Sequence, residues 1–273
     1  MNKVFKRILL IIALFGINSW LYANPALDKK PKLYALVIGI GEYPNAHFSS
    51  RFAKNDATAI YQKLESQVGD IYTEGSIKLL NQPKQTTEVS IRQAFLDIKP
   101  KIKSNDLFVL YIAGKADRID ETYYLLTSQS QDFSAEQLKY TGLSITQLKK
   151  WIADIPTTNK LILLDTAMSD SVIKVNDVFA KNISECKTGM ILTAGHYTLN
   201  KEFRGHSIFT YGVIDALSGI ADRNKNGWIE SNELAQYVRA IVPAIAKNEF
   251  DRRQMPYIDQ CGGDLQFKKI PRE

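Results

Sequence analysis

Long apolar runs alternate along this chain with segments in which apolar residues recur at helical spacing. The apolar runs cover residues 33–40, 107–113 and 160–165, a pattern typical of strands that are buried on both faces of a sheet. Helical spacing is found over residues 53–68, 89–102, 144–155, 209–217 and 234–245. Shorter strands are predicted at 77–80, 190–194 and 264–267, with a hairpin arm at 123–127. The alternation predicts one α/β domain over residues 33–270, with a mostly parallel central sheet and helices on both faces.

The first residues differ in kind from the rest of the chain. Three basic residues precede an apolar run over residues 8–17, and Leu21-Tyr22-Ala23 then provides a small residue before Asn24. This order is typical of a secretory signal, and an apolar run of about ten residues is short against the about 20 that a spanning helix needs. We therefore predict a signal peptide at 1–23, a linker at 24–32, and a periplasmic or secreted protein with no stable membrane span after processing.

Composition and charge narrow the function classes. Hydrophobic residues make up 45% of the chain and charged residues 23%, as in ordinary globular proteins. Loss of Lys3, Lys6 and Arg7 with the leader lowers the formal net charge from +6 to +3, which gives no support to nucleic-acid binding. After export, Cys186 and Cys261 would face an oxidising compartment, where they either form one disulfide or remain two buried thiols.

Several short motifs follow one another in a characteristic order. They are residues 34–40 with Tyr43, Asn55-Asp56-Ala57, 107–114, 161–165, 205–211 and Gln254-Met255-Pro256. In content and order these segments resemble the caspase, metacaspase and paracaspase group of cysteine peptidases, especially its bacterial members. The resemblance covers nearly the whole chain after the leader, and it implies a three-layer sandwich with the sheet between two layers of helices.

The two catalytic positions of that group are substituted here. Where the group has Gly-His-Gly, with the His as general base, this chain has Gly114-Lys115-Ala116. Where the group has Asp-Ala-Cys-His-Ser-Gly, with the Cys as nucleophile, this chain has the run from Asp165 to Asp170, with Ala167 at the Cys position. A methyl group supplies neither a thiolate nor a proton, so the resemblance implies that the family's cysteine chemistry is lost at Lys115 and Ala167.

A replacement dyad is the alternative. Hydroxyl–lysine pairs are catalytic on other folds, and Lys115 would form one with Thr166 or Ser169 if burial strongly lowered the lysine pKa. The other interpretation of Lys115 is a solvated cation, or an ion pair with a nearby aspartate (Asp117, Asp165 or Asp170). The two cysteines are expected on the wrong side of their strands to replace the nucleophile.

Asp165 is the candidate for a substrate pocket. Metacaspase-like members use an acidic residue at this position to hold an Arg or Lys side chain, so the resemblance implies that a basic peptide is bound. The alternative is that Asp165 only hydrogen-bonds at the end of its strand. The three histidines (His47, His196 and His206) lack the spacing of metal ligands and are expected to be structural or solvated.

Residues 222–233 match the calcium loop of an EF-hand. Oxygen-bearing side chains stand at the first, third and fifth positions, glycine at the sixth and glutamate at the twelfth. The expected ligands are Asp222, Asn224, Asn226, the backbone carbonyl of Trp228, and Glu233. The two asparagines, together with the positive charges of Arg223 and Lys225, predict weak binding, with a Kd on the order of 10⁻⁴ to 10⁻³ M. The alternative is a turn between two helices that binds no metal.

These observations predict an exported, catalytically inactive member of this fold that binds a protein or peptide in a regulatory or scaffolding role. No cofactor is required, weak calcium binding at residues 222–233 is left open, and the oligomeric state stays open. The alternative is an active enzyme, either a caspase-type cysteine endopeptidase or another hydrolase that uses Lys115 with Thr166 or Ser169.

Overall fold

The computed structural model describes residues 30–69, 72–120, 122–132, 134–168, 188–196 and 202–269. From Pro31 onward the chain is built on one eight-stranded sheet, in which the six longer strands have the order β11-β7-β6-β3-β1-β2. These strands are β1 (Lys32–Gly39), β2 (Thr73–Leu80), β3 (Leu107–Ile119), β6 (Asn159–Met168), β7 (Thr188–His196) and β11 (Met255–Gly262). All neighbours from β2 to β7 are parallel, and β11 is antiparallel to β7. The predicted α/β fold is confirmed.

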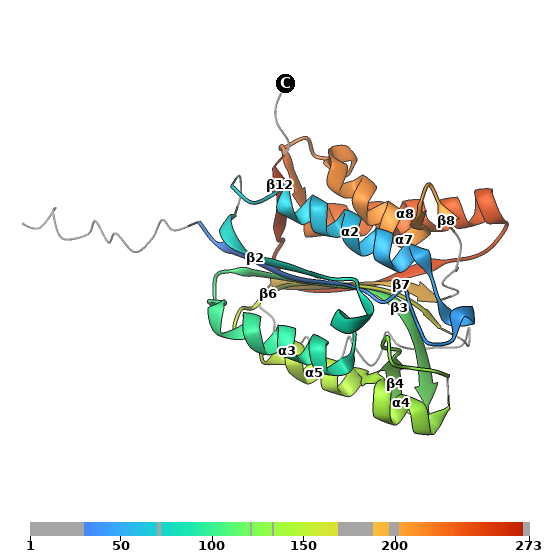
Figure 1. Ribbon diagram of the computed structural model, residues 1–273. Helices are drawn as coiled ribbons and strands as arrows, with labels where there is room; N and C mark the ends of the chain where they lie inside the picture. Colours follow the sequence, from blue (N-terminus) through green and yellow to red (C-terminus); the bar gives the residue numbers. More distant parts are fainter. Residues whose placement is uncertain are drawn as a thin grey trace, which may run out of the picture. The chain divides into compact units, whose positions relative to one another are not determined.

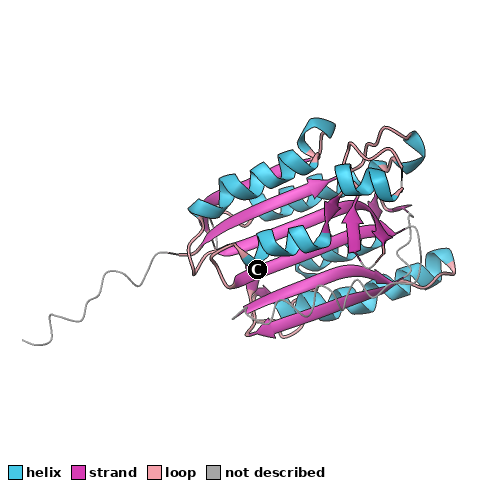
Figure 2. Cartoon of the chain, turned by 90° about the horizontal axis from the view of Figure 1, so that it is seen from below, coloured by secondary structure: helices cyan, strands magenta, loops and turns pink. Residues whose placement is uncertain are grey.

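Helices cover both faces of this sheet (Figure 1). One face carries α2 (Arg51–Glu65), α7 (Ile208–Asp215) and α8 (Ser231–Phe250), and η5 (Ala216–Ile220) continues α7 as a π-helix. The other face carries α3 (Glu88–Ile98) and α5 (Ile145–Ala153), with α4 (Ala135–Thr141) beside a short hairpin arm. Figure 2 shows the long strands side by side. The result is the expected arrangement of three layers.

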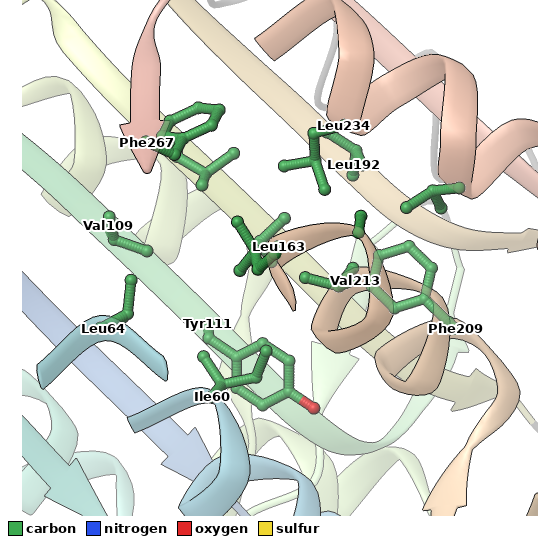
Figure 3. Packing of buried hydrophobic residues seen from close by; sticks show 14 of the residues in the cluster. Ile60, Leu64, Val109, Tyr111, Leu163, Leu192, Phe209, Val213, Leu234 and Phe267 are labelled. Carbon is green, nitrogen blue, oxygen red and sulfur yellow. The ribbon is translucent and has the colours of Figure 1, made fainter. Parts of the chain in front are cut away.

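Alternating side chains of each strand fill two separate cores. On β3, Val109 and Tyr111 pack against α2 and α7, whereas Phe108 and Leu110 pack against α3 and α5. Figure 3 shows the first core, in which side chains of β3, β6 and β7 interleave with those of α2 and α7. Burying one such side chain stabilises the fold by about 1.5 to 3 kcal/mol, which explains why these strands are continuous apolar runs in the sequence.

The hairpin arm lengthens β3 beyond the expected strand. β3 continues past residue 113 to Ile119 and pairs with β4 (Thr122–Leu125), which in turn pairs with β5 (Leu143–Ser144). Residues 114–119 are mostly polar or small, so the hydrophobic pattern ends before the strand does. The extension carries Lys115 within a strand rather than in a loop.

The strand expected at 264–267 does not join the main sheet. β12 (Gln266–Lys269) instead pairs with β10 (Trp228–Glu230) in a separate two-stranded sheet, and β11 forms the sheet edge. Most residues of β11 are only half-buried because an edge strand has a single neighbour. Its sequence therefore lacks the apolar run that marks the central strands. A third, two-stranded sheet joins β8 (Glu202–Phe203) and β9 (His206–Ser207).

The predicted leader lies outside the described residues, as do residues 24–29 of the predicted linker. β1 begins at Lys32, the last residue assigned to that linker. Across the described ranges, no helix has both the length and the apolar character needed to cross a membrane.

Candidate functional site at the carboxyl edge of the sheet

The carboxyl ends of β3 and β6 meet at one edge of the sheet, here called the carboxyl edge. Their parallel register pairs Ala113 with Asp165, and two residues further on it pairs Lys115 with Ala167. Neighbouring strands lie about 4.8 Å apart. The two positions that the resemblance assigns to the base and the nucleophile therefore lie opposite each other.

Side chains at this edge alternate between the two faces of the sheet. On β3, Ala113 packs in the core on the α2 side and Ala116 in the core on the α3 side, so Lys115 projects on the α2 side. On β6, Asp165 bonds to α7 on that same side, and alternation directs Thr166 to the other. The Thr166 hydroxyl and the Lys115 ammonium therefore project from opposite faces.

Lys115 is a half-buried cation, and its partial removal from water lowers the pKa of its ammonium group. Its backbone N–H donates to the Tyr43 hydroxyl at 3.1 Å, and its Nζ lies 6.0 Å from the ring centroid of Phe48. Within the part of the chain that the structure describes, Lys115 forms no ion pair. Ser169, its other predicted dyad partner, and Asp170, an expected ion-pair partner, lie outside the described residues.

Asp165 is enclosed in the protein, with 6% of its surface exposed. Its Oδ2 accepts hydrogen bonds from the hydroxyls of Ser207 and, at 2.6 Å, Thr210 at the start of α7. The Thr210 hydroxyl also lies 2.6 Å from that of the buried Tyr111. Burial, and then the negative charge of Asp56, raise the pKa of Asp165 to about 7. Asp165 thus holds α7 against β6 through side-chain hydroxyls.

A second buried carboxylate, Asp56 on α2, adjoins this network. Its Oδ1 lies 2.8 Å from His206 Nδ1, and its Oδ2 accepts the Ser207 backbone N–H at 3.2 Å. Burial raises the pKa of Asp56, and the hydrogen bond and charge of His206 oppose that shift. Sequence reasoning missed this pair, although both residues lie in motifs that carried the resemblance. His206 is structural, as expected, but its partner is a carboxylate 150 residues away.

Comparison with known proteins identifies the family of this chain. The family model described as the caspase domain matches residues 32–264, most of the chain. The chain belongs to the caspase-domain family. Among solved structures, its fold is similar to the crystal structure of protein GSU0716 from Geobacter sulfurreducens, with a TM-score of 0.59, 10% identity, and coverage of 88% of this chain and 98% of that chain. At this identity the likeness shows the fold alone, and among curated proteins no match is found.

The predicted calcium loop of this caspase-domain protein is tightly folded. Asp222 accepts backbone N–H groups from Asn226 at 3.1 Å and Gly227 at 3.0 Å. Asn224 Oδ1 accepts the N–H of Asn226, and Asn226 Oδ1 that of Trp228, each at 2.8 Å. Gly227 has a φ of +86°, which only glycine adopts readily. The three side chains therefore bend toward the loop's own backbone.

Glu233, the twelfth loop position, closes the loop from the first turn of α8. Its Oε1 accepts the N–H groups of Arg223 at 3.0 Å and Asn224 at 3.2 Å, and its Oε2 accepts that of Glu230 at 3.3 Å. Across the described ranges, no three or more His, Cys, Asp or Glu side chains are grouped to hold a metal ion. A cation here would be held by two carboxylates, Asp222 and Glu233, with amide and carbonyl oxygens completing its shell.

Cys261 lies far from the candidate site of this caspase domain. On β11 it pairs with Gly189 near the start of β7, so it sits at the amino ends of the parallel strands. It cannot replace the nucleophile from there, as the sequence predicted for this cysteine. Cys261 is disulfide-bonded, and Cys186, the chain's other cysteine, lies outside the described residues.

Proposed function

We propose that this is an exported caspase-domain protein without peptidase activity, which binds a protein or peptide segment at the carboxyl edge of its sheet in a regulatory or scaffolding role. The observation that carries the proposal is the pairing of Lys115 with Ala167 across β3 and β6. A Cys–His dyad at these positions would have its two side chains on one face of neighbouring strands, close enough to share a proton.

Under this proposal, both groups that peptide cleavage needs are missing. A positioned general base contributes about 10² to 10⁴ in rate, and a half-buried ammonium without a carboxylate partner does not accept a proton near neutral pH unless its pKa falls by several units. Alanine in place of the nucleophile prevents an acyl-enzyme altogether. Loss of both groups leaves the binding surface without the covalent chemistry.

The hydrogen-bonded residues around Lys115 and Asp165 support the proposal of binding. The carboxyl ends of parallel strands are where α/β sheets bind ligands. Tyr43 still fixes the backbone of Lys115, and Ser207 and Thr210 still tie α7 to Asp165. A surface kept in register by buried hydrogen bonds is preorganised to bind a segment, even where catalysis is absent.

Export is part of the proposal. Its support is the basic and apolar leader with Ala23 before the linker. N-terminal sequencing of the protein from the periplasm or medium should give a chain that begins at Asn24. A full-length chain retained in the cytoplasm would exclude export.

The second candidate is a lysine-dependent hydrolase, and the lowered pKa of Lys115 favours it. Its partner would have to be Ser169, because Thr166 projects from the opposite face of β6. Replacing Ser169 by alanine abolishes any turnover under this alternative and leaves the binding proposal untouched.

The experiment that tests the proposal restores the dyad. The exported chain carrying Lys115→His with Ala167→Cys should hydrolyse fluorogenic peptides, while either single variant stays at background, since each lacks one of the two groups. The matched control is Lys115→His with Ala167→Ser, which keeps the geometry but has no thiol. Hydrolysis by the native protein would overturn the proposal, as would a folded double variant that neither cleaves nor binds any peptide.

A further inference from the structure

The charges at the carboxyl edge favour an acidic ligand. Lys115 has its backbone fixed on both sides, by the Tyr43 hydroxyl at 3.1 Å and by the Leu126 N–H, which donates to its carbonyl at 2.9 Å. Its ammonium is partly removed from water, with the Phe48 ring as a neighbour 6.0 Å away. A cation in such surroundings loses hydration, and an aromatic face replaces only part of it.

Three described carboxylates near Lys115 have other hydrogen-bond or ion-pair partners. Asp165, on the same face, accepts the hydroxyls of Ser207 and Thr210. Glu42, which precedes Tyr43, pairs with Lys54 at 2.5 Å. Asp117, two residues along β3, accepts the Arg118 backbone N–H at 2.7 Å.

None of these three carboxylates forms an ion pair with Lys115 within the described residues. Asp165 was the sequence's reason to expect a basic peptide. Because the Asp165 carboxylate is buried and already accepts hydrogen bonds from two hydroxyls, an incoming cation has little access to it. Among these four groups, Lys115 is the one that can attract an anionic ligand.

We propose that the segment bound at the carboxyl edge carries a carboxylate, and that the Lys115 ammonium binds this carboxylate. The inference rests on the proposed function and names the chemical class of its ligand. An Asp or Glu side chain and a free chain terminus present the same group, so the test separates these sources. A carboxylate at this position gains a charge-assisted hydrogen bond and supplies a counter-ion that the described residues do not give Lys115.

The test uses labelled ten-residue peptide pools with one fixed central residue, and fluorescence anisotropy with the exported chain. Pools with Asp or Glu are compared with their neutral matches, Asn and Gln, and with Lys, all acetylated and amidated. A further pool with a free C-terminus identifies a terminal carboxylate as the source. We expect the acidic pools to bind about tenfold more tightly than the neutral ones, a difference of about 1.4 kcal/mol.

Variants assign the effect to one residue. Lys115→Met keeps the apolar stem and should remove the preference for acidic pools, whereas Lys115→Arg should keep it. Lys149→Met is the matched control: Lys149 is also half-buried with a lowered pKa, but it lies on α5 at the other face of the sheet, and its loss should leave the preference intact. Melting curves confirm that the variants are folded.

The outcomes distinguish the two proposals. If no pool binds the native protein, the proposed function fails, and the inference fails with it. If pools bind with equal affinity for Asp and Asn, or if Lys115→Met retains the acidic preference, the inference alone is overturned. A preference for the Lys pool that disappears in Asp165→Asn would restore the basic peptide as the ligand.

Discussion

The carboxylate of Asp165 accepts a hydrogen bond from the Thr210 hydroxyl at 2.6 Å, 45 residues along the chain. This bond joins the carboxyl end of β6 to the first turn of α7, two residues before Ala167. Asp165, the candidate residue for a substrate pocket in the sequence, is therefore held in the protein interior.

The first prediction concerns the pH dependence of stability. The pKa of Asp165 in the folded protein, about 7, lies above its ordinary value of 3.8, so between these values the folded protein retains a proton that the unfolded chain releases. The free energy of unfolding should therefore fall as the pH rises from about 4 to about 7. Asp165→Asn should flatten this slope, as measured by urea denaturation across that range.

The control for this prediction is Asp154→Asn. Asp154 is exposed and pairs with Lys99 at the surface, where an ion pair contributes about 0 to 1 kcal/mol. This variant should keep the native slope. A native protein whose stability rises steadily from pH 4 to 7, with no change in Asp165→Asn, would contradict the assignment.

The second prediction concerns calcium. At a calcium concentration ten times a millimolar Kd, binding should stabilise the protein by about 1.4 kcal/mol and raise its Tm by about 3 to 5 °C. The gain is small because Asp222 and Glu233 must exchange backbone N–H partners for the ion. Asp222→Asn keeps one of the two acceptor oxygens but loses the charge, so it should abolish the shift seen by differential scanning fluorimetry with calcium or chelator. An equal shift in this variant would show that calcium acts outside the loop.

The third prediction concerns Cys261. Since the chain has one other cysteine, peptide mapping without reductant should recover the peptides of Cys186 and Cys261 as one cross-linked species. Such a bond closes a loop of roughly 75 residues and should stabilise the fold by about 4 kcal/mol. Cys186→Ser and Cys261→Ser should then lower the free energy of unfolding equally, and the double variant no further. A covalent dimer on a non-reducing gel would contradict this pairing.

The order of the strands and helices can be predicted from the sequence because the central strands are buried on both faces. Leu110 and Leu163 lie in opposite cores, and the continuous apolar runs around them report this directly. The same runs locate Lys115 and Ala167 just beyond the apolar parts of β3 and β6, which is why the two positions that the resemblance assigns to the base and the nucleophile can be placed from motifs alone.

The remaining features depend on contacts between distant segments. Asp56 and His206 are each ordinary in their own surroundings, and only the fold brings α2 and β9 together. β11 lacks the continuous apolar run of the central strands because an edge strand buries less of each side chain. The burial of Asp165 likewise depends on hydroxyls from α7, which nothing adjacent to it in the sequence indicates.

Whether the native chain cleaves peptides is measured as hydrolysis of a mixed fluorogenic peptide library, with Arg, Lys and Asp cleavage sites, with and without millimolar calcium. We expect no turnover above that of Lys115→Ala, because the positions that the resemblance assigns to the base and the nucleophile hold Lys115 and Ala167. Turnover by the native chain that disappears in Lys115→Ala or Ser169→Ala would contradict it and would establish a lysine-dependent enzyme at the carboxyl edge.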